Sequence, residues 1–185
     1  MHTGVFLFGG VEMEDAGSGP PAPTDRRYDN RKIWETTERI IDMGVVSEQL
    51  GFDSYWLTEH HFQYEGYEVI PNGILIGTIL AERTERIKIG MAFNVVPQWH
   101  PLRLAEDFAT LDVVSGGRAE VWVGKGVEPY VYRQFGQDNK RAVDMQREGL
   151  ELLMRLWTEE NVSWSGEFRA PLDNVTLEPR PIQAP

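Results

Sequence analysis

Cysteine is absent from this sequence of 185 residues. Without thiols, the chain has no disulfide, no thiolate metal site and no cysteine nucleophile. Basic residues are also scarce, because 18 lysines and arginines stand against 29 aspartates and glutamates, for a formal net charge of −11. An acidic chain repels the phosphate groups of nucleic acids and of anionic membranes, so neither is an expected partner.

Long apolar runs are absent as well. No segment approaches the roughly 18 apolar residues that a membrane-spanning helix needs, and the first residues lack the basic and apolar regions of a signal peptide. We therefore expect a cytoplasmic protein without membrane contact. A hydrophobic content of 41%, with 11% aromatic residues, predicts a globular domain with a substantial core.

Strand-like and helix-like patterns alternate four times along the chain, which is typical of an α/β fold. The expected strands cover residues 5–8, 54–57, 87–96 and 119–123. Apolar residues at helical spacing mark helices around residues 33–45, 74–81, 104–111 and 143–157, although the second of these patterns also fits a strand. Because the strands are apolar rather than alternating, we expect a parallel sheet covered by helices.

Two α/β architectures fit this order, a doubly wound sheet and a (β/α)8 barrel. A dinucleotide-binding sheet carries a G-x-G-x-x-G motif in its first βα turn, and Gly9-Gly10 lacks that spacing. In a barrel, the carboxyl end of every strand can contribute to one site. We therefore predict a (β/α)8 TIM-barrel type, with residues 1–185 forming one domain that covers about the first four βα units.

The segments between these elements are irregular. Residues 11–30, rich in Gly, Pro and Asp, are expected to form a long loop after the first strand, either an active-site loop or a tolerated insertion. Ser115-Gly116-Gly117-Arg118 is expected to end the third helix, because glycine readily adopts the left-handed cap geometry. Residues 162–168 suggest a hairpin, and prolines punctuate an extended tail over residues 171–185.

The strongest chemical signal is Thr58-Glu59-His60-His61-Phe62, directly after the second expected strand. Imidazole is the best general base near neutral pH, and a carboxylate can hold it in one orientation, so His60 and Glu59 are the candidate catalytic residues. Neighbouring side chains of an extended segment point opposite ways, so one histidine should face the site and the other should be structural. A metal site that combines this motif with His100 is the rival interpretation, but spaced pairs such as H-E-x-x-H are missing, and we predict no metal.

Two further strand ends carry candidate binding residues. Gly124-Lys125-Gly126 follows the fourth strand, where a close glycine backbone and the Lys125 ammonium suit a phosphate group, and a flexible turn is the simpler alternative. Asn94 is a polar residue within the apolar third strand. It either bonds a ligand ring or satisfies a neighbouring loop.

Together, these motifs resemble the bacterial luciferase-like flavin monooxygenases. The resemblance extends over about residues 1–160 in order, spacing and strand placement. The segments that carry it are residues 51–62, 89–97, 100–107 and 111–126.

The resemblance implies a barrel that binds reduced FMN at the carboxyl ends of its strands. O2 adds to the flavin in this family, and the resulting peroxyflavin oxidises a small organic substrate. Carried over by position, His60 acts in proton transfer, and His61 is structural or lies at an interface. Ala92, Phe93 and Asn94 are expected to line the flavin.

Three specific expectations follow from the resemblance. Lys125 stands where the family usually has an arginine on the flavin phosphate, so the charge is kept but the two-pronged geometry is lost. Ala92-Phe93 aligns with a non-proline cis peptide that supports the flavin ring in relatives. Family members have eight βα units, so residues 171–185 should lead to a missing fifth strand. The chain is then a fragment of a longer protein, or two copies complete a barrel.

The same resemblance leaves the cofactor and the activity open. Deazaflavin F420-dependent oxidoreductases share the barrel and transfer hydride without oxygen, and some relatives are non-catalytic flavin-binding subunits. A flavin reductase that supplies reduced FMN is an expected partner. Full-length relatives commonly form homodimers, so a homodimer is expected.

Overall fold

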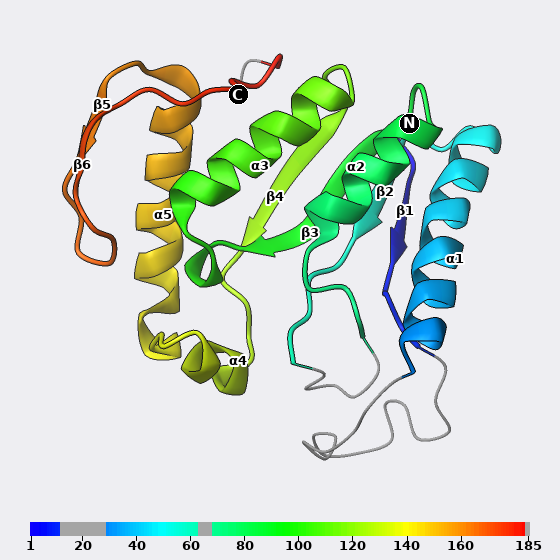
Figure 1. Cartoon of the computed structure of the whole chain (residues 1–185), viewed down its shortest axis with the longest axis horizontal. Coiled ribbons are helices and arrows are strands. Elements are labelled where there is room, and N and C mark those ends of the chain that lie inside the picture. Colours follow the sequence, from blue (N-terminus) through cyan, green and yellow to red (C-terminus); the bar gives the residue numbers. More distant parts are fainter. Residues whose placement is uncertain (12–28, 63–67, 184–185) are drawn as a thin grey trace.

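The computed structural model of the chain describes residues 1–11, 29–62 and 68–183. Its main body is a parallel sheet of four strands in the order β1-β2-β3-β4 (Figure 1), which confirms the predicted α/β class. The strands are β1 (Gly4–Leu7), β2 (Ser54–Leu57), β3 (Lys88–Val95) and β4 (Ala119–Gly124). The long helices are α1 (Asn30–Gln49), α2 (Gly73–Arg83), α3 (Pro101–Val114) and α5 (Ala142–Thr158).

Capping contacts explain where the helices begin and end. The Asp29 side chain accepts a hydrogen bond from a backbone N–H in the first turn of α1, and Asn72 does the same for α2. Pro101 occupies the first turn of α3, where its missing N–H costs no hydrogen bond. At the other end of α3, Gly116 and Gly117 have φ angles of 68° and 83°. That left-handed geometry confirms the predicted helix stop.

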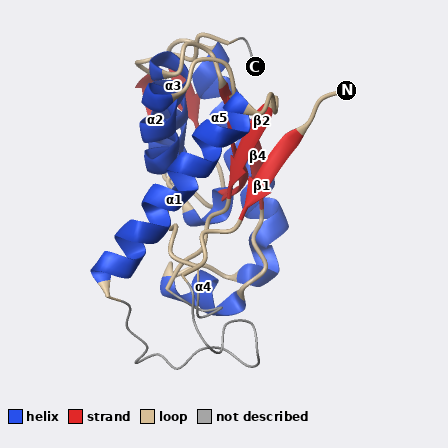
Figure 2. Cartoon of the chain, turned by 90° about the vertical axis from the view of Figure 1, so that its right-hand side faces the viewer, coloured by secondary structure: helices blue, strands red, loops and turns tan. Residues whose placement is uncertain are grey.

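Helices α1, α2 and α3 lie on one face of the sheet (Figure 2). The strand side chains of Tyr55, Leu57, Ile89 and Met91 belong to the main core, and each is at most 1% exposed. These alternate residues of β2 and β3 point to the same face, as the period of a strand requires. The apolar residues of the strands therefore serve to pack the helices onto this covered face.

The opposite face of the sheet is aromatic and more open. Phe6 of β1 is 48% exposed and Trp122 of β4 is 51% exposed. Between them, Trp56 of β2 packs against Trp122 with 4.2 Å between ring centroids. Because β1 and β4 each pair with one neighbour only, both are edge strands of this sheet.

Three elements differ from the expectation. The sequence does not predict α4 (Pro129–Gln134), because so short a helix shows no clear periodicity. The expected hairpin is longer than residues 162–168: β5 (Val162–Trp164) pairs antiparallel with β6 (Leu172–Val175), so part of the predicted extended tail is a strand. Val96, expected in the third strand, belongs to the 3-10 helix η1 (Val96–Gln98), and a second such helix, η2 (Asn139–Arg141), precedes α5.

Two other expectations concern loops and membranes. The predicted long loop over residues 11–30 falls mostly outside the described residues, and only its two ends belong to them. Within the described ranges, no helix combines the length and the apolar character that crossing a membrane requires.

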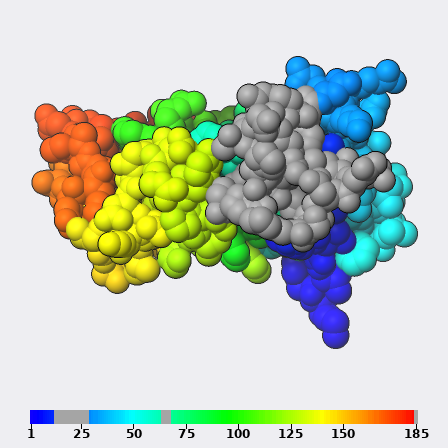
Figure 3. Space-filling view, turned by 90° about the horizontal axis from the view of Figure 1, so that it is seen from below, coloured from blue at the N-terminus to red at the C-terminus, as the bar shows by residue number. Residues whose placement is uncertain are grey.

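The carboxyl ends of the four strands meet at the end of the molecule where α4 lies (Figure 1). Figure 3 looks onto this end, with the start of α5 in yellow on one side and α1 in light blue on the other. In α/β folds with parallel strands, ligands bind at this end, because loops from several strands converge there.

Candidate active site

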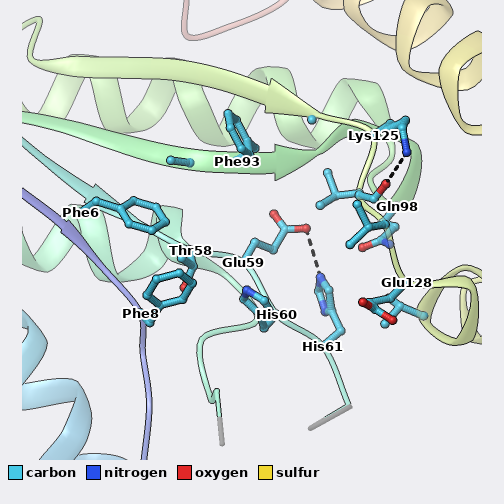
Figure 4. A pocket seen from close by; sticks show the side chains of 16 residues that line it. Phe6, Phe8, Thr58, Glu59, His60, His61, Phe93, Gln98, Lys125 and Glu128 are labelled. Carbon is cyan, nitrogen blue, oxygen red and sulfur yellow. Dashed lines mark hydrogen bonds and ion pairs between the residues drawn. The ribbon is translucent and has the colours of Figure 1, made fainter. Parts of the chain in front are cut away.

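A pocket with a cavity volume of about 410 Å³ lies at the carboxyl ends of the strands (Figure 4). Its walls come from β1 and the residues that follow it, from the segment after β2, from β3, and from the end of β4 and the segment after it. The predicted site residues that line it are Glu59, His60, Ala92, Phe93 and Lys125. Parallel pairing explains this convergence, because it places the ends of distant segments at one edge.

Glu59 is a buried carboxylate held by three side chains, and its own side chain is 1% exposed. Asn94 Nδ2 donates to Oε2 at 2.8 Å, Trp99 Nε1 lies 3.0 and 2.9 Å from the two oxygens, and His61 Nε2 lies 3.1 Å from Oε1. Such donors offset the loss of hydration of a buried carboxylate. Glu59 therefore orients His61, and the carboxylate that holds His60 is a different one.

The prediction that Asn94 lines the cofactor is corrected by its burial. Asn94 is 0% exposed and is not part of the pocket wall. Its amide instead serves Glu59, in the segment after β2, so the alternative role of satisfying a neighbouring loop is the one that the structure supports. The pairing of β3 with β4 shifts register between Met91 and Asn94, which regular alternation along a strand does not anticipate.

His60 pairs with a different carboxylate, that of Glu68. The distance from His60 Nε2 to Glu68 Oε2 is 2.8 Å, and the side chain of Glu68 is 2% exposed. Thr58 Oγ1 donates to the same oxygen at 3.2 Å. Sequence reasoning missed Glu68, since it follows no strand and belongs to no recognisable motif.

Both histidines line the pocket, so the expectation that only one faces the site is wrong. The strand β2 ends at Leu57. Beyond that residue the backbone is no longer regular, and Phe62 even has a positive φ of 60°. The alternation of side chains that holds within a strand therefore does not apply to His60 and His61.

Aromatic rings form one side of the pocket (Figure 4). Phe6 and Phe8 pack edge to face with 4.9 Å between ring centroids. Phe93 of β3 lines the pocket and is 50% exposed. The peptide bond between Ala92 and Phe93 is cis, which confirms the prediction made for this position. Phe6 and Phe8 were missed as site residues, because apolar strand residues look like core in a sequence.

Lys125 lies toward the other side of the pocket, close to Gln98 (Figure 4). Its Nζ donates to the Gly126 carbonyl at 3.1 Å. Tyr132 donates its hydroxyl to the Lys125 carbonyl, and burial raises the pKa of Tyr132 to about 12. The phenol therefore stays protonated at neutral pH and holds this turn in place as a donor.

Two further observations describe this side of the pocket, one on its backbone and one on a buried polar atom. Gly126 has a φ of 70°, and a Cβ there would lie 2.7 Å from Val95 Cγ1. Gln98 Oε1 is buried and has no hydrogen-bond partner among the described residues. A buried acceptor of this kind is costly unless a donor reaches it.

No group of three or more His, Asp and Glu side chains suited to a metal ion exists among the described residues. His100, which the rival metal interpretation included, is an exposed residue next to α3 and does not line the pocket. The two histidines of the pocket are each paired with a carboxylate instead.

Comparison with known proteins gives one family match over the whole chain. A family model described as luciferase-like monooxygenase matches residues 1–185. The crystal structure of monooxygenase RslO1 from Streptomyces bottropensis superposes with a TM-score of 0.82 at 28% identity, over 99% of this chain and 50% of that chain. The oxygenating constituent of 3,6-diketocamphane monooxygenase from Pseudomonas putida, solved in complex with FMN, gives a TM-score of 0.75 at 26% identity, over 95% and 44% of the two chains.

The chain is also similar to a protein that is named for the cofactor F420. The F420-dependent glucose-6-phosphate dehydrogenase of Amycolatopsis mediterranei is 30% identical over 150 residues, which is 78% of this chain and 44% of that protein. The chain spans less than half the length of the first curated relatives that it matches.

Proposed function

The chain belongs to the luciferase-like monooxygenase family, and on that premise we propose that it carries the flavin site of an FMN-dependent monooxygenase. The reaction uses reduced FMN and O2 to oxidise a small organic substrate. The single observation that carries this proposal is the pocket, where aromatic walls, His60 and Lys125 converge at the carboxyl ends of four strands and in the segments after them.

The residues of the pocket fit the shape and charge of FMN. Phe6 and Phe93 offer apolar ring surface on one side, and Lys125 offers a cation on the other. The glycine backbone on both sides of Lys125 lines the pocket and suits the approach of a phosphate, and the unpaired Oε1 of Gln98 suits a hydroxyl donor such as those of the ribityl chain. Reduced FMN bound there supplies the electrons that activate O2.

Each polar residue of the pocket has a separate task in this proposal. Lys125 holds the phosphate as a point charge, because lysine lacks the fork of an arginine. His60 accepts or returns a proton close to the reacting atoms through its imidazole. Glu59 keeps His61 and Trp99 in place and does not itself touch the reactants, since its carboxylate is occupied by protein donors.

The four βα units form half of a (β/α)8 barrel in this proposal. The aromatic face that carries Phe6 and Trp122 supports it, because such a surface is usually covered in a complete fold. The remaining wall comes from a longer protein or from a second copy of the chain. A flavin reductase supplies the reduced cofactor, and a homodimer is the proposed assembly.

F420-dependent hydride transfer is the second candidate function. The observation that favours it is the 30% identity to an F420-dependent dehydrogenase, which is as high as the identity to the monooxygenase structures named above. F420 also carries a flat ring and a phosphate, so the pocket alone does not separate the two cofactors.

An anaerobic titration tests both functions. We expect the protein to bind reduced FMN more tightly than reduced F420, followed on exposure to oxygen by O2 consumption faster than that of free reduced FMN. Tighter binding of F420 without O2 consumption would favour the dehydrogenase. Tight FMN binding with no effect on oxygen uptake would contradict the monooxygenase and identify a non-catalytic flavin-binding subunit.

The control variant for oxygen activation is His60→Gln, which keeps the size of the side chain and removes its basicity. This variant should bind reduced FMN with less than threefold change and lose at least tenfold in substrate oxidation. Equal losses in binding and in oxidation would mean that His60 shapes the pocket and handles no proton.

A further inference from the structure

Glu68 is a buried carboxylate that neither the family motifs nor the sequence pattern identify as functional. Its side chain is 2% exposed, and it does not line the pocket. A carboxylate buried this deeply is expected to have a defined partner, because leaving it unpaired is costly. The partner is His60, a pocket residue, at 2.8 Å from Nε2 to Oε2.

Backbone contacts hold Glu68 in this position. Gly10, just after β1, forms an antiparallel bridge with Glu68, and Val69 N donates to the Gly9 carbonyl at 2.9 Å. His60 N donates to the Ile70 carbonyl, also at 2.9 Å. The segment that carries Glu68 is thus bonded both to the end of β1 and to the catalytic motif after β2.

The chemistry of the pair decides which nitrogen of His60 carries the proton. A carboxylate has no proton to donate and can only accept. Thr58 Oγ1 also donates to Oε2 of Glu68, so the oxygen that faces His60 is an acceptor in both contacts. Nε2 of His60 must therefore be the protonated nitrogen, and in the neutral ring Nδ1 is then the basic one.

We propose that Glu68 is a positioning residue that fixes the orientation of the His60 imidazole and its Nε2-protonated tautomer, so that proton transfer in the pocket proceeds through Nδ1. The proposal rests on the proposed role of His60 in the reaction. It goes beyond that role by assigning the nitrogen and the group that selects it. Glu68 acts through His60 and touches no reactant.

His61 provides an internal reference in the same pocket. Its Nε2 also lies against a carboxylate, that of Glu59, at 3.1 Å. Glu59 is shared with Asn94 and Trp99, however, whereas within the described part of the chain the carboxylate of Glu68 is bonded to Thr58 and His60. A change at Glu68 should therefore alter the titration of His60 and leave that of His61 almost unchanged.

Several charged groups surround His60 and bear on its titration. Glu68 contacts it directly, and Glu59, His61, Lys125 and Glu128 line the same pocket. Glu68 lies within hydrogen-bond distance of Nε2. Opposite charge at such a distance favours the charged imidazolium, and the interaction weakens with distance for the other charged groups.

The test is nitrogen NMR of the protein labelled with ¹⁵N-histidine, recorded without cofactor over a pH series. The His60 signals are assigned by their loss in His60→Gln. In the unmodified protein, we expect the neutral ring of His60 to show a protonated Nε2 and an unprotonated Nδ1. A protonated Nδ1 would overturn the proposal, and this measurement needs no variant at Glu68.

Glu68→Gln removes the charge at nearly constant volume, and Glu68→Asp is the conservative partner that keeps it. With Gln, the titration midpoint of His60 should fall by about one pH unit or more, because the stabilising opposite charge is lost. With Asp, part of that shift should be recovered, while His61 moves by less than about a third of a unit in both variants. An unmoved His60, or equal movement of both histidines, would overturn the proposal.

These measurements separate the inference from the proposed function. The tautomer and the titration of His60 are read in the absence of FMN and O2. If they behave as expected but reduced FMN does not bind, the proposed function fails and the assignment of Glu68 stands. If FMN-dependent oxidation is found but the tautomer is wrong, the assignment of Glu68 fails alone.

Discussion

The two faces of the sheet have opposite characters. On the face covered by helices, side chains such as Leu57 and Ile89 are 0% exposed and only fill space. At the carboxyl ends and on the other face, Phe6, Phe93 and Trp122 are each about half exposed (48%, 50% and 51%), and polar side chains are arranged in pairs. One part of the molecule thus supplies stability, and the other presents a surface that a ligand can use.

This difference means that substitutions on the two sides should be separable. A change on the covered face should lower the free energy of unfolding, whereas a change in the pocket should lower affinity or activity at nearly constant stability. Pockets are commonly built in this way, on a rigid scaffold that does not itself contact the ligand.

The largest effect is expected from Leu57→Ala on the covered face. Removing this fully buried side chain leaves a cavity in the core between β2 and the helices, which costs about 2–5 kcal/mol in the free energy of unfolding. Urea denaturation followed by circular dichroism measures the loss. Leu75→Ala is the matched control, because Leu75 is 62% exposed and should change stability by less than about 0.5 kcal/mol. Similar losses in the two variants would contradict the assignment of the covered face as the core.

The next effect concerns Lys125 at the pocket. Lys125→Ala should weaken binding of reduced FMN by about 10- to 100-fold, because one charge-assisted contact to a phosphate is lost, while the urea midpoint stays within error. Affinity is measured by anaerobic fluorescence titration at two salt concentrations. Lys125→Arg is the control, since it keeps the charge and should bind within about threefold of the unmodified protein. Riboflavin lacks the phosphate, so the unmodified protein and the two variants should bind it with similar affinity. A large difference in their riboflavin affinities would mean that Lys125 contacts another part of the ligand.

The smallest effect is a pH dependence of stability, which comes from Glu48 in α1. Desolvation opposes the charged form of Glu48, but hydrogen bonds from the backbone N–H groups of Ile87, Arg86 and Glu85 outweigh it and hold the pKa of Glu48 below the usual 4.5. A lowered pKa in the folded state stabilises the fold above the unfolded-state pKa, and this contribution is lost as pH falls through the folded-state pKa.

Glu48→Gln should therefore destabilise the protein at pH 7 by about 1 kcal/mol, and the difference from the unmodified protein should shrink as the pH falls below 4.5. Urea denaturation at a series of pH values gives the two curves. Glu35→Gln on the exposed side of the same helix is the control. A stability difference between the two proteins that stays constant down to acid pH would show that the charge of Glu48 does not contribute to its stabilising effect.

Much of the fold was predictable because the relevant signals are local. The strand Ser54–Leu57 is continuous and apolar, Asp29 precedes α1 as a cap, and paired glycines end α3. Each depends on a few neighbouring residues, which a sequence displays directly. The short helix α4 and the strand β6 escaped prediction, because tertiary contacts decide whether such short segments become regular.

The site was predicted in part. The position of His60, Phe93 and Lys125 at one edge follows from the alternation of strands and helices in the chain, so the sequence alone was enough to bring these three residues together. It also determined the absence of thiols and the acidic balance. These properties depend on residue identity and on order, and both are complete before the chain folds.

Only the tertiary structure decided the partners. It paired His60 with Glu68 and not with Glu59, buried Asn94 behind the pocket, and brought Phe6 and Phe8 to its wall. Hydrogen bonds depend on directions and on distances of about 3 Å, which are fixed when separate segments pack against each other. No local pattern encodes such distances, so these pairings had to be observed.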